Sequence, residues 1–461
     1  MKKLHYYICL VCCLSGGLLS CDDFLTESPA DSIPDRDAFN TVEDFTNNLN
    51  GAYSTMGSAD LLGRDLLCFG DLCADACQHN TASFNFQKLA VWSVNDTDDD
   101  LLAVWRCCYQ VVDRTARIIA SAETYSGVET PAFNVCLAQA HALRAWCTFY
   151  LANLYGLPYT YQPGAPGVVN VKTPVATTDR VQRATVAENY AFILEDIAAA
   201  HRCYEKEGTP NPGVYCFNRA AVSAFEARVK LFMGNYAEAR TAAQTAIRQF
   251  GGSLVNTSAQ YTAMWNTSAM SPEDIMRYQR SATQTHSYYF MWGPSGGAEF
   301  VHNVLAEIPE DDIRYDIYNR TQYGKFCGTE LGNATLSIPL FRLPELYLII
   351  AECDAAEGNY ADAAGTLAIV SDARNSALSG QIAADASVMQ QIRDERKWET
   401  LQEGHRFFDA RRWKIKIDVY GGVYPGFDIA RFCYPVPADE VNAGYGVVQT
   451  ENWAAALPAV N

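Results

Sequence analysis

The sequence predicts a mostly α-helical protein, and three observations carry that prediction. From residue 133 onward, long stretches repeat apolar residues at intervals of three and four, which places them on one face of a helix. One helix–turn–helix pattern occurs twice, with its turns at Gly234 and Gly358. The alternation of strands and helices that is typical of α/β proteins is absent from the sequence. The expected fold class is therefore all-α, interrupted by one loop-rich part at 251–343.

The chain is long and acidic. Its 461 residues, 49% of them hydrophobic, can bury a large core in one big or two ordinary domains. After the first twenty residues, no apolar run is long enough to span a bilayer. The net charge of −18 predicts that the chain does not bind nucleic acid, because phosphate affinity rests on Lys and Arg.

The N-terminus has the parts of a lipoprotein signal peptide. Lys2 and Lys3 form a short basic region, and residues 6–19 form an apolar region too short for a stable membrane span. Leu18-Leu19-Ser20-Cys21 follows and resembles a bacterial lipobox. We therefore expect residues 1–20 to be removed, and residues 21–34 to be a lipidated Cys21 with its tether. The alternative is an ordinary secretory peptide in which Cys21 is incidental.

Two helices are expected in the N-terminal part. The first covers 35–56, and the second follows the acidic run 95–100. The acidic run suggests a calcium loop, but Leu101 and Cys107 stand where such a loop needs Gly and Glu. We therefore interpret the run as the cap and first-turn charge of the second helix.

The cysteines do not form a recognisable metal-binding pattern. Of the 16 in the chain, Cys68, Cys73 and Cys77 lie near His79, but their spacing fits no standard zinc site. Cys73 and Cys77 are four residues apart, which we interpret as a buried helix face. No metal or cofactor is expected, and disulfide pairing cannot be read from the sequence.

The central and C-terminal parts predict stacked helix pairs. A helix over 132–155 is followed by Gly156, and Thr185-x-x-Glu188 forms a capping box for the next helix. The two repeats, Gly-Asn-Tyr-Ala-Glu-Ala from Gly234 and Gly-Asn-Tyr-Ala-Asp-Ala from Gly358, lie 358 − 234 = 124 residues apart. Each resembles the inter-helix turn of a tetratricopeptide repeat, which stacks helix pairs around a shared core.

The stretch 392–413 is the most unusual part of the sequence. It combines one apolar stripe with eleven charged residues, and Gly404 is expected to end or kink its helix. We interpret the charges as structural ion pairs, rather than as the acid and base of an active site. The pairs expected at i,i+3 spacing are Arg396–Glu399, Arg406–Asp409 and Asp409–Arg412.

This stretch also resembles a known family. Its motif consists of Glu395-Arg396, Glu399, Glu403-Gly404, Arg406, Asp409 and Arg412-Trp413. The motif is similar to the C-terminal signature of the SusD/RagB family of outer-membrane nutrient-binding lipoproteins. Two further segments agree in family order: Leu143-Arg144-Ala145 with its exit at Gly156, and the closing segment 433–442.

The resemblance implies a fold and a function. It implies one SusD-like domain over 35–461, with tetratricopeptide-like repeat helices at about 133–250 and 344–413 and a variable ligand-binding part at about 251–343. It further implies a lipid-anchored protein on the outer membrane, facing the cell exterior. Such a protein passes an oligosaccharide, or in some members a peptide, to a SusC-like TonB-dependent transporter. A tetratricopeptide scaffold that assembles envelope proteins is the alternative.

The ligand-contacting residues cannot be carried over from the family and are chosen by chemistry. Residues 287–297 concentrate aromatic rings, Gly and Pro, which suits stacking on sugars, although the rings could equally fill a local core. The same segment contains a formal G-x-S-x-G at Ser295, but without the strand and helix that a nucleophile elbow needs, so no catalytic residue is expected. The candidate ligand contacts are Trp92, Asn95, Tyr288, Tyr289 and Trp292.

Overall fold

The structure is a computed structural model, and helices make up most of it, as the sequence predicts. It describes residues 38–80, 84, 86–176, 178–266, 270–280, 291–292, 296–301, 305–320, 324–325 and 336–459. Cys21, Tyr288, Tyr289 and Ser295 therefore lie outside the described residues. In the described part, no helix is both long enough and apolar enough to cross a membrane.

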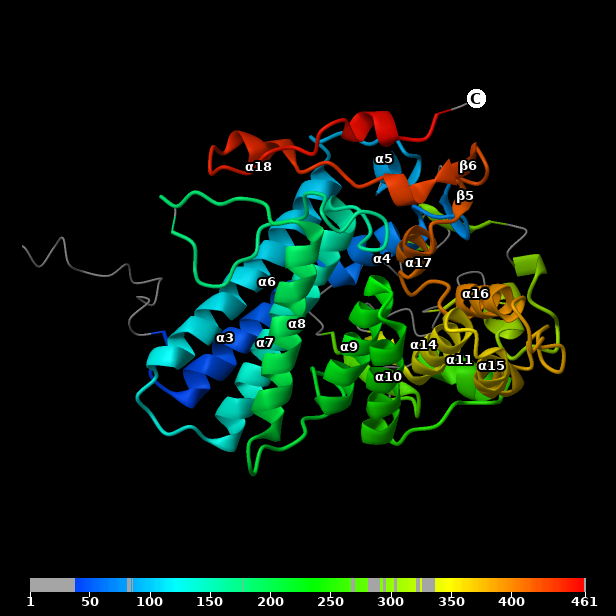
Figure 1. Ribbon diagram of the computed structural model, residues 1–461, viewed down its shortest axis with the longest axis horizontal. Helices are drawn as coiled ribbons and strands as arrows, with labels where there is room; N and C mark the ends of the chain where they lie inside the picture. Colours follow the sequence, from blue (N-terminus) through cyan, green and yellow to red (C-terminus); the bar gives the residue numbers. More distant parts are fainter. Residues whose placement is uncertain are drawn as a thin grey trace, which may run out of the picture.

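The main helices pack one after another along the molecule, from α3 at one end to α16 at the other (Figure 1). The first half comprises α3 (Val42–Met56), α6 (Asp99–Thr124), α7 (Pro131–Tyr155), α8 (Val186–Glu205), α9 (Arg219–Met233) and α10 (Tyr236–Phe250). The second half comprises α14 (Leu343–Ala356), α15 (Tyr360–Arg374), α16 (Val388–Glu399) and α17 (Arg406–Trp413).

Capping side chains fix where several of these helices begin. Thr185 accepts a hydrogen bond from the Glu188 N–H and Glu188 caps Thr185 in return, so the predicted capping box is confirmed. Asp98 accepts from the Asp100 N–H at the start of α6, as the interpretation of the acidic run required. Thr41 and Asp44 form a second capping box, which starts α3 at Val42.

The repeated sequence motif forms two similar helix pairs. Gly234 between α9 and α10 has φ +77°, and Gly358 between α14 and α15 has φ +83°. Glycine reaches this left-handed region at little cost, which allows the tight turn between antiparallel helices. Ala239 and Ala363 are fully buried where the second helix of each pair packs. Because α10 packs on α14, the two pairs lie against each other, as in a helical repeat array.

Short strands and short helices also occur, in the part at 251–343 and elsewhere in the chain, and the sequence did not predict them. Three antiparallel two-stranded sheets occur among the described residues, pairing β1 with β3, β2 with β4 and β5 with β6. The strands are β1 (Cys77–His79), β2 (Asp274–Tyr278), β3 (Ala298–Phe300), β4 (Ile338–Arg342), β5 (Lys416–Val419) and β6 (Tyr424–Asp428). The short helices are η3 (Ala59–Gly63), α4 (Asp65–Asp71), α5 (Gln87–Ala90), α11 (Ser258–Asn266), η4 (Asp316–Arg320), η5 (Ile429–Arg431), α18 (Ala438–Asn442) and η6 (Trp453–Ala456).

The interpretation of Cys73 and Cys77 as one helix face is wrong. Helix α4 ends at Asp71, so Cys73 lies in the following turn and Cys77 lies in β1. Both side chains are nevertheless fully buried, and the Cys73 thiol donates to the Leu89 carbonyl at 3.7 Å. Their apolar surroundings arise from tertiary packing between α4, β1 and α5 rather than from helical spacing.

The signature stretch forms two helices rather than one. Helix α16 ends at Glu399 and α17 begins at Arg406, with Gly404 at φ +76° between them. The Gly404 N–H donates to a carboxylate oxygen of Asp71 at 3.1 Å, so α4 fixes the turn from outside. The expected chain break at Gly404 is confirmed.

The ion pairs of the stretch differ in part from those expected, because they are buried and join separate segments. Asp409–Arg412 forms at 2.8 Å as predicted. Arg396, however, pairs with Asp409 at 2.7 Å instead of with Glu399. Arg406 pairs with Asp75 at 2.6 Å instead of with Asp409.

Glu399 is the centre of a buried arginine cluster. It accepts hydrogen bonds from Arg374 at 2.9 Å, Arg342 at 2.8 Å and Arg314 at 3.2 Å. Burial alone would raise the pKa of Glu399, but the guanidinium groups of Arg374 and Arg342 lower it well below its usual range. Since Arg314 and Arg342 belong to the loop-rich part, the cluster fastens that part to α16. The structural interpretation of these charges is confirmed.

Candidate functional site

The structure buries two of the rings that the sequence suggested as ligand contacts. Trp92 is 4% exposed and packs edge-on against Phe427 and Phe432, at centroid distances of 4.9 and 5.1 Å. Trp292 is also 4% exposed, and its ring lies 4.7 Å from that of Phe300. Stacking on a ligand needs an accessible ring face, so the described structure does not support a contact by Trp92 or Trp292. For Trp292, the alternative of a local core agrees with the structure.

Asn95 is exposed but is engaged in a local turn. Its side-chain oxygen accepts hydrogen bonds from the Thr97 N–H at 3.1 Å and the Thr97 hydroxyl at 3.2 Å. This geometry forms an Asx turn ahead of α6. The structure therefore brings no shared ligand surface together from Trp92, Asn95 and Trp292.

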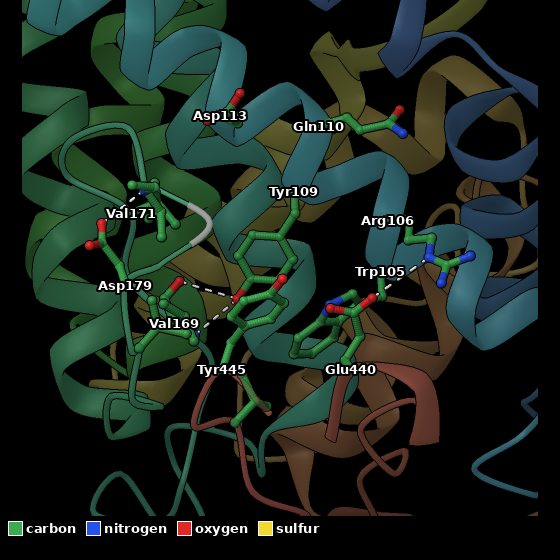
Figure 2. A pocket seen from close by; sticks show the side chains of 14 residues that line it. Trp105, Arg106, Tyr109, Gln110, Asp113, Val169, Val171, Asp179, Glu440 and Tyr445 are labelled. Carbon is green, nitrogen blue, oxygen red and sulfur yellow. Dashed lines mark hydrogen bonds and ion pairs between the residues drawn. The ribbon is translucent and has the colours of Figure 1, made fainter. Parts of the chain in front are cut away.

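An open pocket of about 440 Å³ lies elsewhere, between α6, the loop 166–181 and the C-terminal segment 440–447 (Figure 2). We call it the α6 pocket. It is lined by Trp105, Arg106, Tyr109, Gln110, Asp113, Val169, Val171, Val175, Ala176, Asp179, Val181, Glu440, Tyr445 and Val447. Its volume is within the range of small-ligand sites.

Helix α6 provides one wall of the α6 pocket. Trp105, Tyr109 and Asp113 are spaced four residues apart, so they lie on one helix face. The Trp105 ring is 3% exposed and packs edge-on against Tyr155 at 4.8 Å, which anchors this wall in the core. Tyr109 is only partly buried by area, and its ring faces the pocket (Figure 2).

The Tyr109 hydroxyl ties the loop to this helix. It donates to the Val169 carbonyl at 3.2 Å and accepts from the Val169 N–H at 2.9 Å. Burial raises the pKa of the Tyr109 phenol, so the group is protonated at neutral pH and can make both bonds. The position of Val169 and its neighbours at the pocket floor is therefore set by one side chain of α6.

The loop and the C-terminal segment form the opposite wall by pairing with each other. The Val181 N–H donates to the Tyr445 carbonyl at 2.8 Å, and Arg180 donates to the Gly444 carbonyl at 2.6 Å. Gly446 has φ +100°, and a Cβ there would lie 2.6 Å from the Val181 carbonyl oxygen. Only glycine permits this approach, which brings Tyr445 and Val447 to the pocket.

Arg183 holds these walls to the helical scaffold. Its guanidinium donates to carbonyls of α7 and of the loop, namely Tyr155 at 3.0 Å and Gly167 at 2.6 Å. It also donates to the Val448 carbonyl at 3.1 Å and the Thr450 hydroxyl at 2.9 Å in the C-terminal segment. Burial without an adjacent carboxylate among the described residues lowers the pKa of Arg183. One side chain thus joins three segments that are distant in the sequence.

The rim of the α6 pocket is acidic. Its lining contains one cation, Arg106, and three carboxylates, Asp113, Asp179 and Glu440, a formal balance of 1 − 3 = −2. Adding the ion-pair partners of these groups, Arg117 and Asp439, leaves the balance unchanged.

The α6 pocket is equipped for binding. Tyr445 is 45% exposed and offers a ring, the valines offer aliphatic surface, and Gln110 offers an exposed amide. The lining contains no serine, cysteine or histidine that could act as a nucleophile with its base. Among the described residues, no group of three or more metal-ligating side chains is placed to hold a metal ion.

Two family profiles match the sequence and together cover most of it. The profile described as "SusD family" matches residues 315–431, which include the signature helices. The profile described as "Starch-binding associating with outer membrane" matches residues 23–231. The chain belongs to the SusD/RagB family. The fold agrees, since its helical repeats resemble those of solved SusD superfamily structures.

One such structure is that of a SusD superfamily protein from Bacteroides thetaiotaomicron. It superposes with a TM-score of 0.79 at 22% identity, and the match covers 89% of this chain and 100% of that protein's chain. A SusD-like carbohydrate binding protein from Bacteroides vulgatus has a TM-score of 0.71 at 20% identity over 82% of this chain and 85% of its own. At such identities the likeness establishes the fold.

Curated relatives come from Formosa agariphila. SusD-like protein P25 is 21% identical over 87% of this chain and 88% of its own length. SusD-like protein P2 is 26% identical over 50% of this chain, a match that spans 44% of that relative.

Sequence reasoning missed most of the α6 pocket. The sequence predicts the helix that follows the acidic run, but it did not single out Trp105, Tyr109 and Asp113 as site residues. Their spacing of four residues was the available signal. No comparable signal existed for Tyr445, because its place depends on pairing with a loop more than 260 residues earlier in the chain, at Val181.

Proposed function

We propose that this SusD-family protein captures oligosaccharides at the outer membrane without catalysing a reaction on them. It is held there by a lipid on Cys21 and passes its ligand to a SusC-like TonB-dependent transporter. Two observations support a carbohydrate ligand: a matching family described as starch-binding, and a carbohydrate-binding protein of the same fold. The same family description, as associating with the outer membrane, supports the location.

The observation that carries the proposal on the structural side is the composition of the α6 pocket. Sugar rings present C–H faces that pack on aromatic side chains and hydroxyls that bond to carboxylates and amides. The pocket offers both kinds of group, from the Tyr109 and Tyr445 rings and from Gln110, Asp179 and Glu440.

Calorimetry with a panel of host and plant oligosaccharides tests the proposal. At least one glycan should bind, and Tyr445→Ala should weaken it about ten- to a hundredfold, the usual effect of removing an aromatic contact. Tyr161→Ala is the matched control, because Tyr161 is similarly exposed at 39% but does not line the pocket. If the folded protein bound peptides and no glycan, the carbohydrate proposal would be wrong.

A further inference from the structure

The floor of the α6 pocket is aliphatic. Five valines line the pocket, at positions 169, 171, 175, 181 and 447. Val169, Val171 and Val447 are between 7% and 8% exposed, so little more than their pocket-facing surface remains accessible, while Val175 is 38% exposed at the rim. Valine methyl groups offer neither donor nor acceptor to a hydroxyl. A sugar hydroxyl pressed against them would lose its water partners without replacement.

The two tyrosine rings above this floor add further apolar surface to it. The Tyr109 hydroxyl is occupied on both sides by Val169, so it presents a ring face to the pocket rather than a free polar group. Tyr445 contributes a second ring from the opposite wall. The deeper part of the pocket therefore favours a ligand group that is apolar and small, such as a methyl or an acetyl group.

The rim sets the charge of the ligand. Asp179 is exposed, and its Oδ2 accepts a hydrogen bond from the Ala176 N–H at 2.8 Å, which fixes the carboxylate at the mouth. Asp113 and Arg117 neutralise each other at 2.9 Å, and Glu440 shares Arg106 with Asp439. The lining and its ion-pair partners keep a formal balance of −2. Arg180 and Arg183 in the opposite wall donate to backbone carbonyls and reduce this negative charge, so a carboxylate or sulfate on the ligand would be disfavoured rather than excluded.

We propose that the α6 pocket takes an uncharged saccharide that carries an apolar substituent, either the acetyl group of an N-acetylhexosamine or the methyl group of a 6-deoxyhexose. This inference rests on the proposed function and names its ligand class. The substituent lies on the valine floor, the sugar face lies on Tyr109 or Tyr445, and the hydroxyls reach Gln110 and the rim carboxylates. The acidic rim disfavours uronic acids and sulfated sugars.

Calorimetry on the full-length protein in detergent tests this with pairs of ligands that differ in one feature. Chitotriose carries acetamido groups that cellotriose lacks, and L-fucose carries a methyl group where L-galactose has a hydroxymethyl group. The first pair therefore tests for an acetyl group on the valine floor, and the second pair tests for a methyl group. The substituted member of at least one pair should bind about fivefold more tightly, as expected for one buried methyl group. A hyaluronan oligomer, which adds carboxylates to N-acetylated sugars, should bind more weakly than chitotriose.

Two variants locate the preference in the α6 pocket. Val175→Thr keeps the side-chain shape but replaces one methyl group at the exposed rim by a hydroxyl. It should reduce the preference for the substituted sugar over the unsubstituted one about two- to threefold. Val128→Thr is its control, because Val128 is 78% exposed and lies outside the pocket. Asp179→Asn keeps a hydrogen-bond acceptor at the rim but removes its charge, so it should raise the affinity for the hyaluronan oligomer relative to the affinity for chitotriose.

The possible failures are distinct. If unsubstituted sugars bind as well as substituted ones, and Tyr445→Ala weakens both, the inference is overturned while the proposed function stands. If a preference appears but neither Val175→Thr nor Tyr445→Ala alters it, the α6 pocket is not its source and the inference also fails. If no glycan binds to protein with a normal thermal melt, the proposed function itself is rejected.

Discussion

Arg396 in α16 donates to Asp409 in α17, with its Nε 2.7 Å from a carboxylate oxygen, across the turn that contains Gly404. Asp409 also accepts from Arg412, which in turn pairs with Glu352 in α14. Arg396 and Asp409 are 0% and 2% exposed. The family signature is thus a buried chain of charges that fixes the relative positions of three helices.

Removing either member of this pair should destabilise the protein strongly. Arg396→Ala removes one of the two cations that pair with the buried Asp409 carboxylate. Asp409→Ala removes the carboxylate with which both Arg396 and Arg412 pair. Each variant should lose about 3–5 kcal/mol of unfolding free energy, as is usual when one partner of a buried ion pair is removed. Urea denaturation gives the value. Wild-type stability combined with lost ligand binding would show instead that these residues belong to a binding site.

Glu345 should make stability depend on pH in the acid range. It accepts two hydrogen bonds from Arg228, at 2.8 and 2.7 Å. Burial raises its pKa, but Arg228 and other nearby cations outweigh this and lower the pKa from 4.5 to about 2. The unfolded chain therefore binds this proton first, so the stabilisation is complete above pH 4.5 and is lost as the pH falls through about 2.

The measurement compares wild type with Glu345→Gln at several pH values. The difference in unfolding free energy should shrink by about 2 kcal/mol between about pH 6 and about pH 3. Glu238→Gln is the control, because Glu238 pairs with Lys230 at 3.1 Å but its side chain is 62% exposed. A pH-independent difference for Glu345→Gln would contradict the prediction.

The C-terminal wall of the α6 pocket should depend on Arg183. Arg183→Lys keeps the charge but cannot donate to three segments at once, because an ammonium lacks the planar fork of a guanidinium. We expect a loss of about 1–3 kcal/mol in stability and faster proteolysis near residues 444–450. The affinity for the ligand should also fall, because this wall of the pocket is less well held. Arg431→Lys, at a side chain that is 69% exposed, should change none of the three.

Trp92 and Trp292 should behave as core residues. Replacing either ring by alanine removes packing against buried neighbours and should cost about 3–5 kcal/mol of stability. Thermal melts of Trp92→Ala and Trp292→Ala provide the measurement, with Tyr445→Ala as an exposed comparison. A normal melt together with weaker glycan binding would restore these rings as ligand contacts.

The lipid anchor is tested by Cys21→Ala. This position lies outside the described residues, and the prediction rests on the lipobox sequence that ends there. The variant should appear in the soluble fraction or remain unprocessed, because no thiol is left to carry diacylglycerol. Membrane fractionation of cells is the measurement, and an unchanged membrane association of the variant would reject lipidation.

The sequence by itself determined the features whose cause is local. Helical spacing placed the long helices, Thr185 and Glu188 marked a helix start, and Gly234 and Gly358 marked turns. Each of these depends on residues within about one helical turn of one another, so the pattern is readable without neighbours in space. The same holds for the break at Gly404, and for the family signature itself.

Tertiary structure decided which charges meet and which rings are accessible. Arg396 pairs with Asp409 rather than Glu399 because the chain turns back at Gly404, and Glu399 is taken by Arg314, Arg342 and Arg374 from other segments. Aromatic composition alone does not distinguish a core ring from a binding ring, because both are large and apolar; Trp92 proved buried and Tyr445 exposed. The α6 pocket exists only because Val181 and Tyr445 pair across a long sequence separation, which no local pattern records.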